Sequence, residues 1–261
     1  MNVKELFDLK GKTAVVTGGY TGIGRQMALA LAEAGANVVV CARNLEGCEK
    51  TAREIAESTG VKTLALKCDV SSEADVVKMV ADTVAKFGSL DILINNAGIA
   101  MGGLPEETKR EDWDKILDIN LTGTFLCARE AAKEMIKAGR GKIINISSVM
   151  GYQTTSVVSA PAYVASKGAV VTLTKDLAIR WIKHNISVNA IAPGWFPTNM
   201  TEPVISPEFM DMGKELLASI PAGRFGGEDD LKGVTVLLAS RASDYITGEV
   251  IVVDGGTLSR Y

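Results

Sequence analysis

Two residues capable of proton chemistry, Tyr163 and Lys167, lie four positions apart in the stretch "APAYVASKGAV". In a helix this spacing places both side chains on one face, one turn apart. A phenol with a pKa of about 10 exchanges protons poorly at neutral pH, and a neighbouring cation favours its ionised form. The same pair also fits a packed tyrosine beside a solvated lysine. These two residues alone therefore leave both interpretations open.

Three glycines, Gly18, Gly22 and Gly24, follow a short apolar run in the segment "TGGYTGIG". A glycine turn at the start of a helix lets the pyrophosphate of a dinucleotide approach the free N–H groups there. The spacing differs from the usual G-x-G-x-x-G, and glycines at such a turn also occur for packing alone. A P-loop is excluded, because Arg25 and Gln26 stand where a lysine and a Ser/Thr would follow.

The end of the next predicted strand, "CARN", bears on the choice of dinucleotide. Ala42 stands where NAD-binding folds tend to carry an acidic residue, and Arg43 follows it. A carboxylate accepts a hydrogen bond from the ribose 2′-hydroxyl of NAD, whereas an arginine suits the 2′-phosphate of NADP. The pattern favours NADP(H), although a solvated arginine at a strand end is also common.

Short β-branched segments alternate with longer helical ones along the whole chain. Strands are predicted at residues 12–18, 36–43, 61–70, 90–98, 141–148, 186–194 and 248–256. Helices are predicted at residues 22–35, 45–58, 72–88, 111–138, 162–183 and 228–240. This alternation predicts an α/β fold, a doubly wound and mostly parallel seven-stranded sheet with helices on both faces. Without a linker or a shift of composition, we expect residues 1–261 to form one domain, with the irregular stretch 197–225 as a substrate lid.

The composition is that of an ordinary globular protein and excludes several function classes. The 261 residues carry a formal net charge of -3, which gives no reason to expect a nucleic-acid partner. The start, "MNVKELFDLKGK", lacks the apolar run of a signal peptide, and no apolar segment approaches the roughly 20 residues of a membrane span. The four cysteines show no metal-ligand spacing, so we expect a reducing, cytoplasmic setting. Cys41 and Cys68 lie in strand-like apolar runs, so we expect these two to be small buried side chains.

Five short motifs in order resemble the short-chain dehydrogenase/reductase superfamily. They are the glycine loop, "NNAG" (95–98), "NISS" (145–148), "YVASK" (163–167) and "APGW" (192–195). Each motif is weak by itself, but their joint spacing is specific and covers almost the whole chain. The segments "LFDLKGKTAVVTGG", "CARN" and "IAPGWFPTNMTEPV" look most like gluconate 5-dehydrogenases and NADPH-dependent 3-oxoacyl reductases. The resemblance implies a Rossmann fold.

The resemblance also implies an active site made of Asn120, Ser148, Tyr163 and Lys167. Ser148, rather than Ser147, would hydrogen-bond the carbonyl oxygen of the substrate. Tyr163 would be the general acid in reduction and the general base in oxidation. Lys167, together with an oxidised nicotinamide, would lower the pKa of the phenol and would hold the nicotinamide ribose. Asn120 would anchor a water molecule, and this hydride chemistry needs no metal.

A dinucleotide site along the carboxyl ends of the strands follows from the same resemblance. Asp69 would bind the adenine amino group with Val70 beside the ring, and Ile23 would offer a backbone N–H to the phosphates. The full set of expected cofactor-binding residues is Gly18, Thr21, Gly22, Ile23, Gly24, Arg43, Asp69, Val70, Asn95, Asn96, Ala97, Gly98, Tyr163, Lys167, Pro193, Gly194 and Thr198.

Two departures from the family pattern bear on specificity. Thr21 stands where many NADP-preferring relatives carry an arginine, so Arg43 would hold the 2′-phosphate nearly alone, and NAD stays possible. The segment between Ser148 and Tyr163 is a residue or two longer than in many relatives, so substrate shape transfers less readily from them. The lid contains both apolar and polar residues, among them Trp195, Phe196 and Met200, which fit either substrate contact or packing.

Several functions remain open at this stage. The leading expectation is a ketone/secondary alcohol oxidoreductase acting on a sugar acid or ketogluconate, with a 3-oxoacyl thioester as the alternative substrate. A non-catalytic dinucleotide-binding regulator is disfavoured, because such proteins typically lose the tyrosine or the lysine. By resemblance the chain would form a homotetramer through helices 111–138 and 162–183 and the segment "VIVVDGG". No nucleic-acid or membrane partner is expected.

Overall fold

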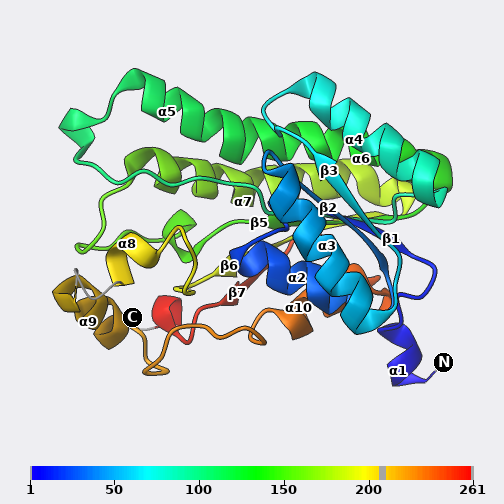
Figure 1. Ribbon diagram of the computed structural model, residues 1–261. Coiled ribbons are helices and arrows are strands. Elements are labelled where there is room, and N and C mark those ends of the chain that lie inside the picture. The colour runs from blue at the N-terminus through cyan, green and yellow to red at the C-terminus, as the bar shows by residue number, and fades with distance from the viewer. Residues whose placement is uncertain (1, 206–209, 260–261) are drawn as a thin grey trace.

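Seven parallel strands form one sheet in the computed structural model, which describes residues 2–205 and 210–259 (Figure 1). The strand order is β3-β2-β1-β4-β5-β6-β7, and every neighbouring pair is parallel. The strands are β1 Thr13–Thr17, β2 Asn37–Ala42, β3 Thr63–Lys67, β4 Ile92–Asn95, β5 Gly141–Ile146, β6 Ile186–Pro193 and β7 Val250–Val253. The predicted doubly wound sheet is confirmed, and its strands are all parallel.

The order of the strands reverses between β1 and β4. The chain runs from β1 outward to β3, returns to place β4 on the other side of β1, and continues outward to β7. The loops that leave β1 and β4 therefore turn to opposite faces of the sheet. A crevice opens between such loops at the carboxyl ends of the strands, where open α/β sheets bind their ligands.

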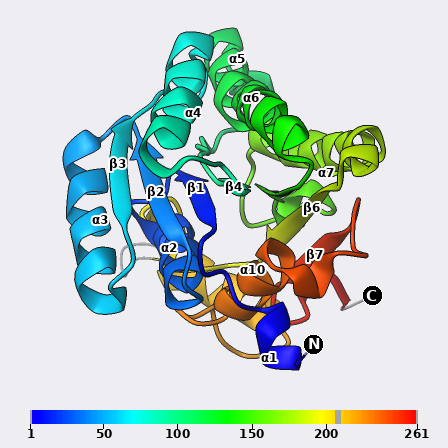
Figure 2. The ribbon, with the colours of Figure 1, turned by 90° about the vertical axis from the view of Figure 1, so that its right-hand side faces the viewer.

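Helices cover both faces of the sheet (Figure 2). One layer contains α2 Gly22–Glu33, α3 Leu45–Thr59 and α10 Lys232–Ala239. The other layer contains α4 Glu73–Phe87, α5 Arg110–Leu117, α6 Gly123–Ala138 and α7 Pro161–Trp181. The other described α-helices are α1 Val3–Leu6, α8 Glu202–Ile205 and α9 Met210–Ser219.

Each central strand sends side chains into two separate cores. In β1, Val15 packs into the core beneath α4, α6 and α7, while Ala14 and Val16 pack into the core beneath α2, α3 and α10. Successive residues of a strand point to opposite faces, so a strand covered on both sides must be apolar throughout. This requirement explains the uninterrupted apolar segments of the sequence.

The long helix expected over residues 111–138 is interrupted. It ends as α5 at Leu117, passes through a π-helical turn over Asp118–Thr122 and resumes as α6 at Gly123. The predicted helical region is therefore confirmed, but the π turn within it was not predicted. Single π turns inside helices occur frequently at functional sites, and this one contains Asn120.

The last helix also begins later than expected, at Lys232 rather than near residue 228. Asp230 lies before it, pairs with Arg224 at 2.5 Å and accepts a hydrogen bond from the Gly227 backbone at 2.7 Å. Asp229 pairs with Lys232 at 3.1 Å. These contacts hold the carboxylates in the turn before α10.

A buried carboxylate, Asp91, joins strands at the edge opposite the crevice. It accepts hydrogen bonds from Thr13 N at 3.1 Å and Ser89 Oγ at 2.7 Å. Arg140 and Lys12 approach its Oδ1 to 3.1 and 3.5 Å. Burial raises the pKa of this carboxyl, but the hydrogen bonds and the two cations outweigh that effect and hold its pKa below the usual value.

All four cysteines are free and buried, which confirms the prediction for Cys41 and Cys68. Cys41 Sγ lies 3.2 Å from Met79 Sδ in one of the two cores, and burial raises the pKa of Cys48 to about 11. Such thiols behave as small hydrophobic side chains. Within residues 2–205 and 210–259, no group of three or more His, Cys, Asp or Glu residues is placed to hold a metal ion. Among the described helices, none combines the length and the apolar character that crossing a bilayer requires.

Candidate active site

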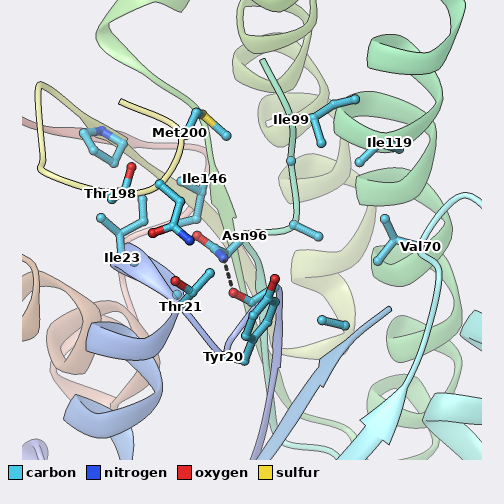
Figure 3. Close-up of a pocket in the computed structure, with 18 of the residues that line it drawn as sticks. Tyr20, Thr21, Ile23, Val70, Asn96, Ile99, Ile119, Ile146, Thr198 and Met200 are labelled. Carbon is cyan, nitrogen blue, oxygen red and sulfur yellow. Dashed lines mark hydrogen bonds between the residues drawn. The ribbon is translucent and has the colours of Figure 1, made fainter. Parts of the chain in front are cut away.

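A pocket of about 450 Å³ lies at the carboxyl ends of the strands (Figure 3). Its walls are the loops that follow β1, β2, β3, β4, β5 and β6, together with the start of α7. The reversal of strand order between β1 and β4 places this pocket, because the neighbouring loops separate there.

The glycine loop is packed against the loop after β4. Asn96 Nδ2 donates hydrogen bonds to Thr17 O at 3.0 Å and to Gly18 O at 3.1 Å, and Figure 3 draws one of these bonds as a dashed line. Gly18 has φ +62°, and a Cβ added there would lie 3.0 Å from the Asn96 amide nitrogen. Gly24 is closed in by the same Asn96 side chain. Gly18 and Gly24 are therefore required for packing, whatever the pocket binds.

The start of α2 opens into the pocket. Thr21 is the N-cap residue, but its side chain accepts no hydrogen bond from the first turn. Gly22, at φ +53°, leaves no side chain between the helix backbone and the pocket. Free N–H groups and the helix dipole at such an end favour negatively charged groups. This end of the pocket is therefore suited to phosphates.

Arg43 and Asp69 line the end of the pocket between β2 and β3. Apart from Lys167, they are the only charged side chains among the described lining residues. Burial raises the pKa of Asp69, but hydrogen bonds from Ser71 and the charge of Arg43 outweigh it, so the pKa is lowered. Tyr20 also lines this end, and its ring packs so closely on Gly47 that a Cβ there would lie 3.0 Å from Tyr20 Cε2. The sequence analysis did not identify Tyr20.

Two adjacent serines at the end of β5 have different surroundings. Ser148 Oγ accepts a hydrogen bond from Met150 N at 3.1 Å, and the Ser148 side chain is near enough to Tyr163 to lower the pKa of the phenol in part. Ser147 Oγ instead donates to Lys167 O at 2.9 Å, which holds the strand end against α7. Both serines line the pocket, and the expectation that Ser148 rather than Ser147 binds a substrate carbonyl stays a prediction.

Lys167 and Tyr163 both lie at the inner wall of the pocket. Lys167 Nζ donates to Ile146 O at 2.7 Å and lies 5.6 Å from the centroid of the Tyr163 ring. Burial lowers the pKa of Lys167 to about 8. Burial also raises the pKa of Tyr163, and the nearby Ser148 side chain offsets only part of that rise. The protein groups alone therefore bring the pair together without lowering the phenol pKa below 10.

Asn120 lies behind the pocket wall and does not line it. Its Oδ1 accepts from Ile99 N at 2.8 Å, while Nδ2 donates to Ile99 O at 2.9 Å and to Ser166 Oγ at 3.1 Å. A Cβ added to Gly98 would lie 3.2 Å from Asn120 Oδ1 and 3.6 Å from Lys167 Nζ. The Asn120 amide therefore positions the loop after β4 beside the lysine.

Asn95 is placed elsewhere than the sequence analysis expected. Its Nδ2 donates to Asn145 Oδ1 at 2.9 Å, and Asn145 Nδ2 donates to Thr174 Oγ1 at 2.9 Å, in the core away from the pocket. Its Oδ1 is buried with no hydrogen-bond partner among the described residues. Successive side chains at the end of β4 point to opposite faces, so Asn96 alone meets the glycine loop.

The loop after β6 closes the pocket over the glycine loop. A Cβ added to Gly22 would lie 3.0 Å from Thr198 Cγ2. Thr201 Oγ1 donates to Phe196 O at 2.6 Å, and Phe196 is 4% exposed within the core beneath α2. Phe196 therefore anchors the loop. Met200 lines the pocket and is 43% exposed, so it remains available to a ligand (Figure 3).

Most predicted site residues meet in this one pocket. The pocket is lined by the predicted residues Gly18, Thr21, Gly22, Ile23, Gly24, Arg43, Asp69, Val70, Asn96, Ala97, Gly98, Ser148, Tyr163, Lys167, Pro193, Gly194 and Thr198. The lining residues that sequence reasoning did not assign are Tyr20, Ala42, Asn44, Cys68, Ile99, Ile119, Ile146, Ser147, Phe196, Asn199, Met200 and Thr201. Many of these residues directly follow or precede a predicted residue. Their positions next to the ends of predicted strands could have identified them as pocket residues.

Comparison with known proteins gives matches over nearly the full chain. A family model described as Enoyl-(Acyl carrier protein) reductase matches residues 18–257. A 2-dehydro-3-deoxy-D-gluconate 5-dehydrogenase of Dickeya dadantii (strain 3937) is 43% identical over 97% of this chain and 98% of that protein.

Two solved structures are similar over the same extent. A short-chain type dehydrogenase/reductase from Mycobacterium marinum is 40% identical, with a TM-score of 0.94 over 98% of this chain and 99% of that one. A gluconate 5-dehydrogenase from Burkholderia cenocepacia J2315, in complex with NADP and tartrate, is 37% identical, with a TM-score of 0.93 over 100% of both chains. The pocket, the motifs and these matches agree, and the chain belongs to the short-chain dehydrogenase/reductase family.

Proposed function

We propose that this protein is an oxidoreductase that transfers a hydride between NADP(H) and a ketone or secondary alcohol. One observation carries the proposal: Ser148, Tyr163 and Lys167 converge on a pocket that also contains the open N-terminus of α2. A proton-transferring group and an anion-binding helix end thus share one cavity. This combination is what hydride transfer to and from a carbonyl requires of the protein.

The residues of the pocket fit a dinucleotide with a 2′-phosphate. The glycine loop and the start of α2 suit the pyrophosphate. Arg43 lies at the far end, where β2 ends in Ala42 rather than a carboxylate. A bound nicotinamide would supply or accept the hydride. The remaining expected contacts fit this orientation, except that Asn95 supports the sheet instead.

The side chains around the reacting carbonyl have separable roles. Ser148 would hydrogen-bond the carbonyl oxygen, and Tyr163 would give its proton to that oxygen in reduction and take it back in oxidation. Lys167, with a pKa of about 8, would carry a positive charge over much of the neutral range and favour the tyrosinate. Asn120 would act through Ile99 and Gly98, by keeping the loop after β4 against Lys167.

A sugar acid or ketogluconate is the substrate we propose. The Dickeya and Burkholderia proteins carry gluconate-dehydrogenase names, and their chains match this one end to end. The part of the pocket beside Thr198 contributes further polar side chains, Asn199 and Thr201. Such groups can hydrogen-bond the hydroxyls of a sugar acid.

We further propose that residues 1–261 act as one catalytic domain with residues 197–225 as its lid, of which 206–209 lie outside the described residues. A homotetramer is supported by exposed apolar side chains on α6 and α7, including Phe125 and Ile179, the latter 73% exposed. The four free thiols favour a reducing compartment, so we place the protein in the cytoplasm.

Replacing Tyr163 by Phe tests the proposed reaction. The ring is kept and only the hydroxyl is lost, so we expect turnover to fall by at least about 100-fold while NADP⁺ still binds. The assay should use 5-ketogluconate, a 3-oxoacyl thioester and a simple ketone, each with NADPH and NADH. Unchanged turnover in Tyr163→Phe would refute the assignment. A preference for the thioester would refute the proposed substrate.

A further inference from the structure

A second cavity, of about 210 Å³, adjoins the candidate active site. Figure 1 shows that the loop after β5, helix α9 and the end of the chain gather at the same end of the molecule. These segments and the loop after β6 supply its lining residues Val149, Met150, Gln153, Thr154, Thr155, Ser156, Trp195, Ser219 and Thr257. The cavity is thus lined in large part by the segment between Ser148 and Tyr163.

The cavity lies within reach of a substrate held at the active site. Val149 follows Ser148 in the chain and Trp195 follows Gly194, and both Ser148 and Gly194 line the first pocket. Trp195 and Tyr163 pack against the same small apolar cluster that contains Val149. A carbonyl compound bound at Ser148 and Tyr163 therefore has this cavity next to it.

The rim of the cavity offers hydrogen-bonding groups without partners. Within residues 2–205 and 210–259, the side chains of Gln153, Thr154 and Ser156 make no hydrogen bond with the protein. Ser219 Oγ donates to Leu216 O at 2.6 Å and Thr257 Oγ1 donates to Asp254 O at 2.7 Å, so both oxygens can still accept. A ligand with several hydroxyl groups would satisfy them.

The cavity carries no charge, which limits the part of a substrate that can enter. None of its described lining residues is Lys, Arg, Asp or Glu. A carboxylate placed there would lose hydration without meeting a cation, which is costly. An acyl chain would leave the amide of Gln153 and the neighbouring hydroxyls unpaired. Neutral hydroxyl groups fit best.

We propose that this cavity is a subsite for the hydroxyl-bearing carbons of the substrate. The reacting carbonyl lies at Ser148 and Tyr163, the hydroxyl-bearing carbons extend between Met150 and Trp195, and the carboxylate that follows them passes beyond the open cavity into solvent. This subsite rests on the proposed function. It would make the enzyme select polyhydroxylated ketones, which Gln153 and Thr154 would recognise.

The variants Gln153→Leu and Thr154→Val test the subsite. Each removes hydrogen-bonding groups with little change of volume, and Thr59→Val, on α3 at the far edge of the sheet, is the matched control. We expect the combined variant to lower kcat/KM for 5-ketogluconate by about tenfold or more, the equivalent of one or two hydrogen bonds. We expect kcat/KM for 2-hexanone, which has no hydroxyls, to stay within about twofold. Equal losses on both ketones, or no loss on either, would overturn the subsite.

A binding measurement tests the subsite independently of the proposed reaction. Calorimetry would follow gluconate binding to the Tyr163→Phe protein saturated with NADP⁺, with and without Gln153→Leu and Thr154→Val. Weaker binding in the combined variant supports the subsite even if the wild-type chain reduces none of the ketones, an outcome that refutes the reaction alone. Identical binding, or no binding to the Tyr163→Phe protein, refutes the subsite and leaves the reaction standing wherever turnover is seen.

Discussion

At the scale of single residues, burial decides what Tyr163 and Lys167 can do. Both side chains lie at the inner wall of the pocket, and desolvation favours their neutral forms. A cation 5.6 Å from the ring centroid favours the tyrosinate, but only while Lys167 keeps its proton. Burial therefore keeps the pKa of Tyr163 above its ordinary value, and a further positive charge nearby would lower it.

The depressed pKa of Lys167 makes a prediction for stability. An unfolded lysine, with a pKa of about 10.4, holds its proton to higher pH than this buried one, with a pKa of about 8. Between about pH 8 and pH 10 the unfolded chain binds more protons at Lys167 than the folded protein does. The contribution of Lys167 to the free energy of unfolding therefore rises as pH increases over this range. The difference in free energy of unfolding between wild type and Lys167→Met should move in favour of wild type by about 2 kcal/mol over this range. Urea denaturation at pH 7.5 and 10 measures it, and a constant difference would contradict the lowered pKa.

Arg43 makes a second prediction, for cofactor choice. Its side chain is exposed beside Asp69, and the pocket wall there offers no other cation among the described lining residues. Arg43→Leu should weaken NADPH binding about tenfold and leave NADH binding nearly unchanged, because only NADPH has the 2′-phosphate. Fluorescence titration of both cofactors checks this. An equal effect on both would mean that Arg43 shapes the pocket without reading the phosphate.

At the scale of elements, loops that are distant in the chain hold each other in place. Thr17 Oγ1 accepts from Asn96 N and Ala97 N at 3.0 Å each, and the Asn96 amide returns two bonds to the glycine loop. The π-helical turn does the same for the loop after β4 through Asn120 and Ile99. The loops of the pocket are thereby held to the ends of rigid strands and helices.

Asn96→Ala tests this coupling. It removes two hydrogen bonds to the backbone of Thr17 and Gly18, so we expect stability to fall by about 1–3 kcal/mol and NADP⁺ affinity to fall several-fold. Asn37→Ala, at the start of β2, is the control, because the side chain of Asn37 makes no hydrogen bond with other described residues. Denaturant titration and calorimetry of NADP⁺ binding give the two readouts. Lower stability with unchanged affinity would show that the glycine loop keeps its shape without Asn96.

At the scale of the whole molecule, the two ends of the parallel strands have different roles. The carboxyl ends of the strands form the pocket, while Asp91 with its hydrogen bonds and ion pairs lies at their amino ends. Parallel α/β sheets bind ligands at the carboxyl ends of their strands, so the opposite ends are free to serve stability. Changes at Asp91 should therefore affect folding and leave cofactor binding intact.

Asp91→Ala should lower the free energy of unfolding at pH 7 by about 2–3 kcal/mol, because it removes hydrogen bonds to a buried charged group. The pKa of Asp91 is lowered in the folded protein, so its contribution is fully present above the unfolded pKa of about 3.9 and is lost as pH falls through the folded pKa. Denaturation of wild type and variant at pH 7 and at pH 3 measures this contribution, and the difference in free energy of unfolding should be smaller at pH 3. KM for NADPH should not change, and a raised KM would argue against separate roles for the two ends of the strands.

Much of the fold could be read from the sequence because its signals are local. Apolar β-branched runs and helical periods recur along the chain, and all seven strands were predicted within a few residues of their ends. The interruption at Asp118–Thr122 was missed, since a π turn leaves no distinct pattern of apolar residues. The late start of α10 was missed because two acidic residues, Asp229 and Asp230, are typical of the first turn of a helix, whereas here Asp230 pairs with Arg224 in the turn before α10.

The sequence by itself determined the alternation of strands and helices, the glycine loop, and the spacing of Ser148, Tyr163 and Lys167, because periodicity and motif spacing are properties of neighbours in the chain. Only the tertiary structure decided that Asn96 rather than Asn95 meets the glycine loop, and that Tyr163 and Lys167 are desolvated. It also decided that Gln153 and Thr257, over a hundred positions apart, border one cavity. These outcomes depend on the direction of each side chain at a strand end and on burial by segments distant in the sequence.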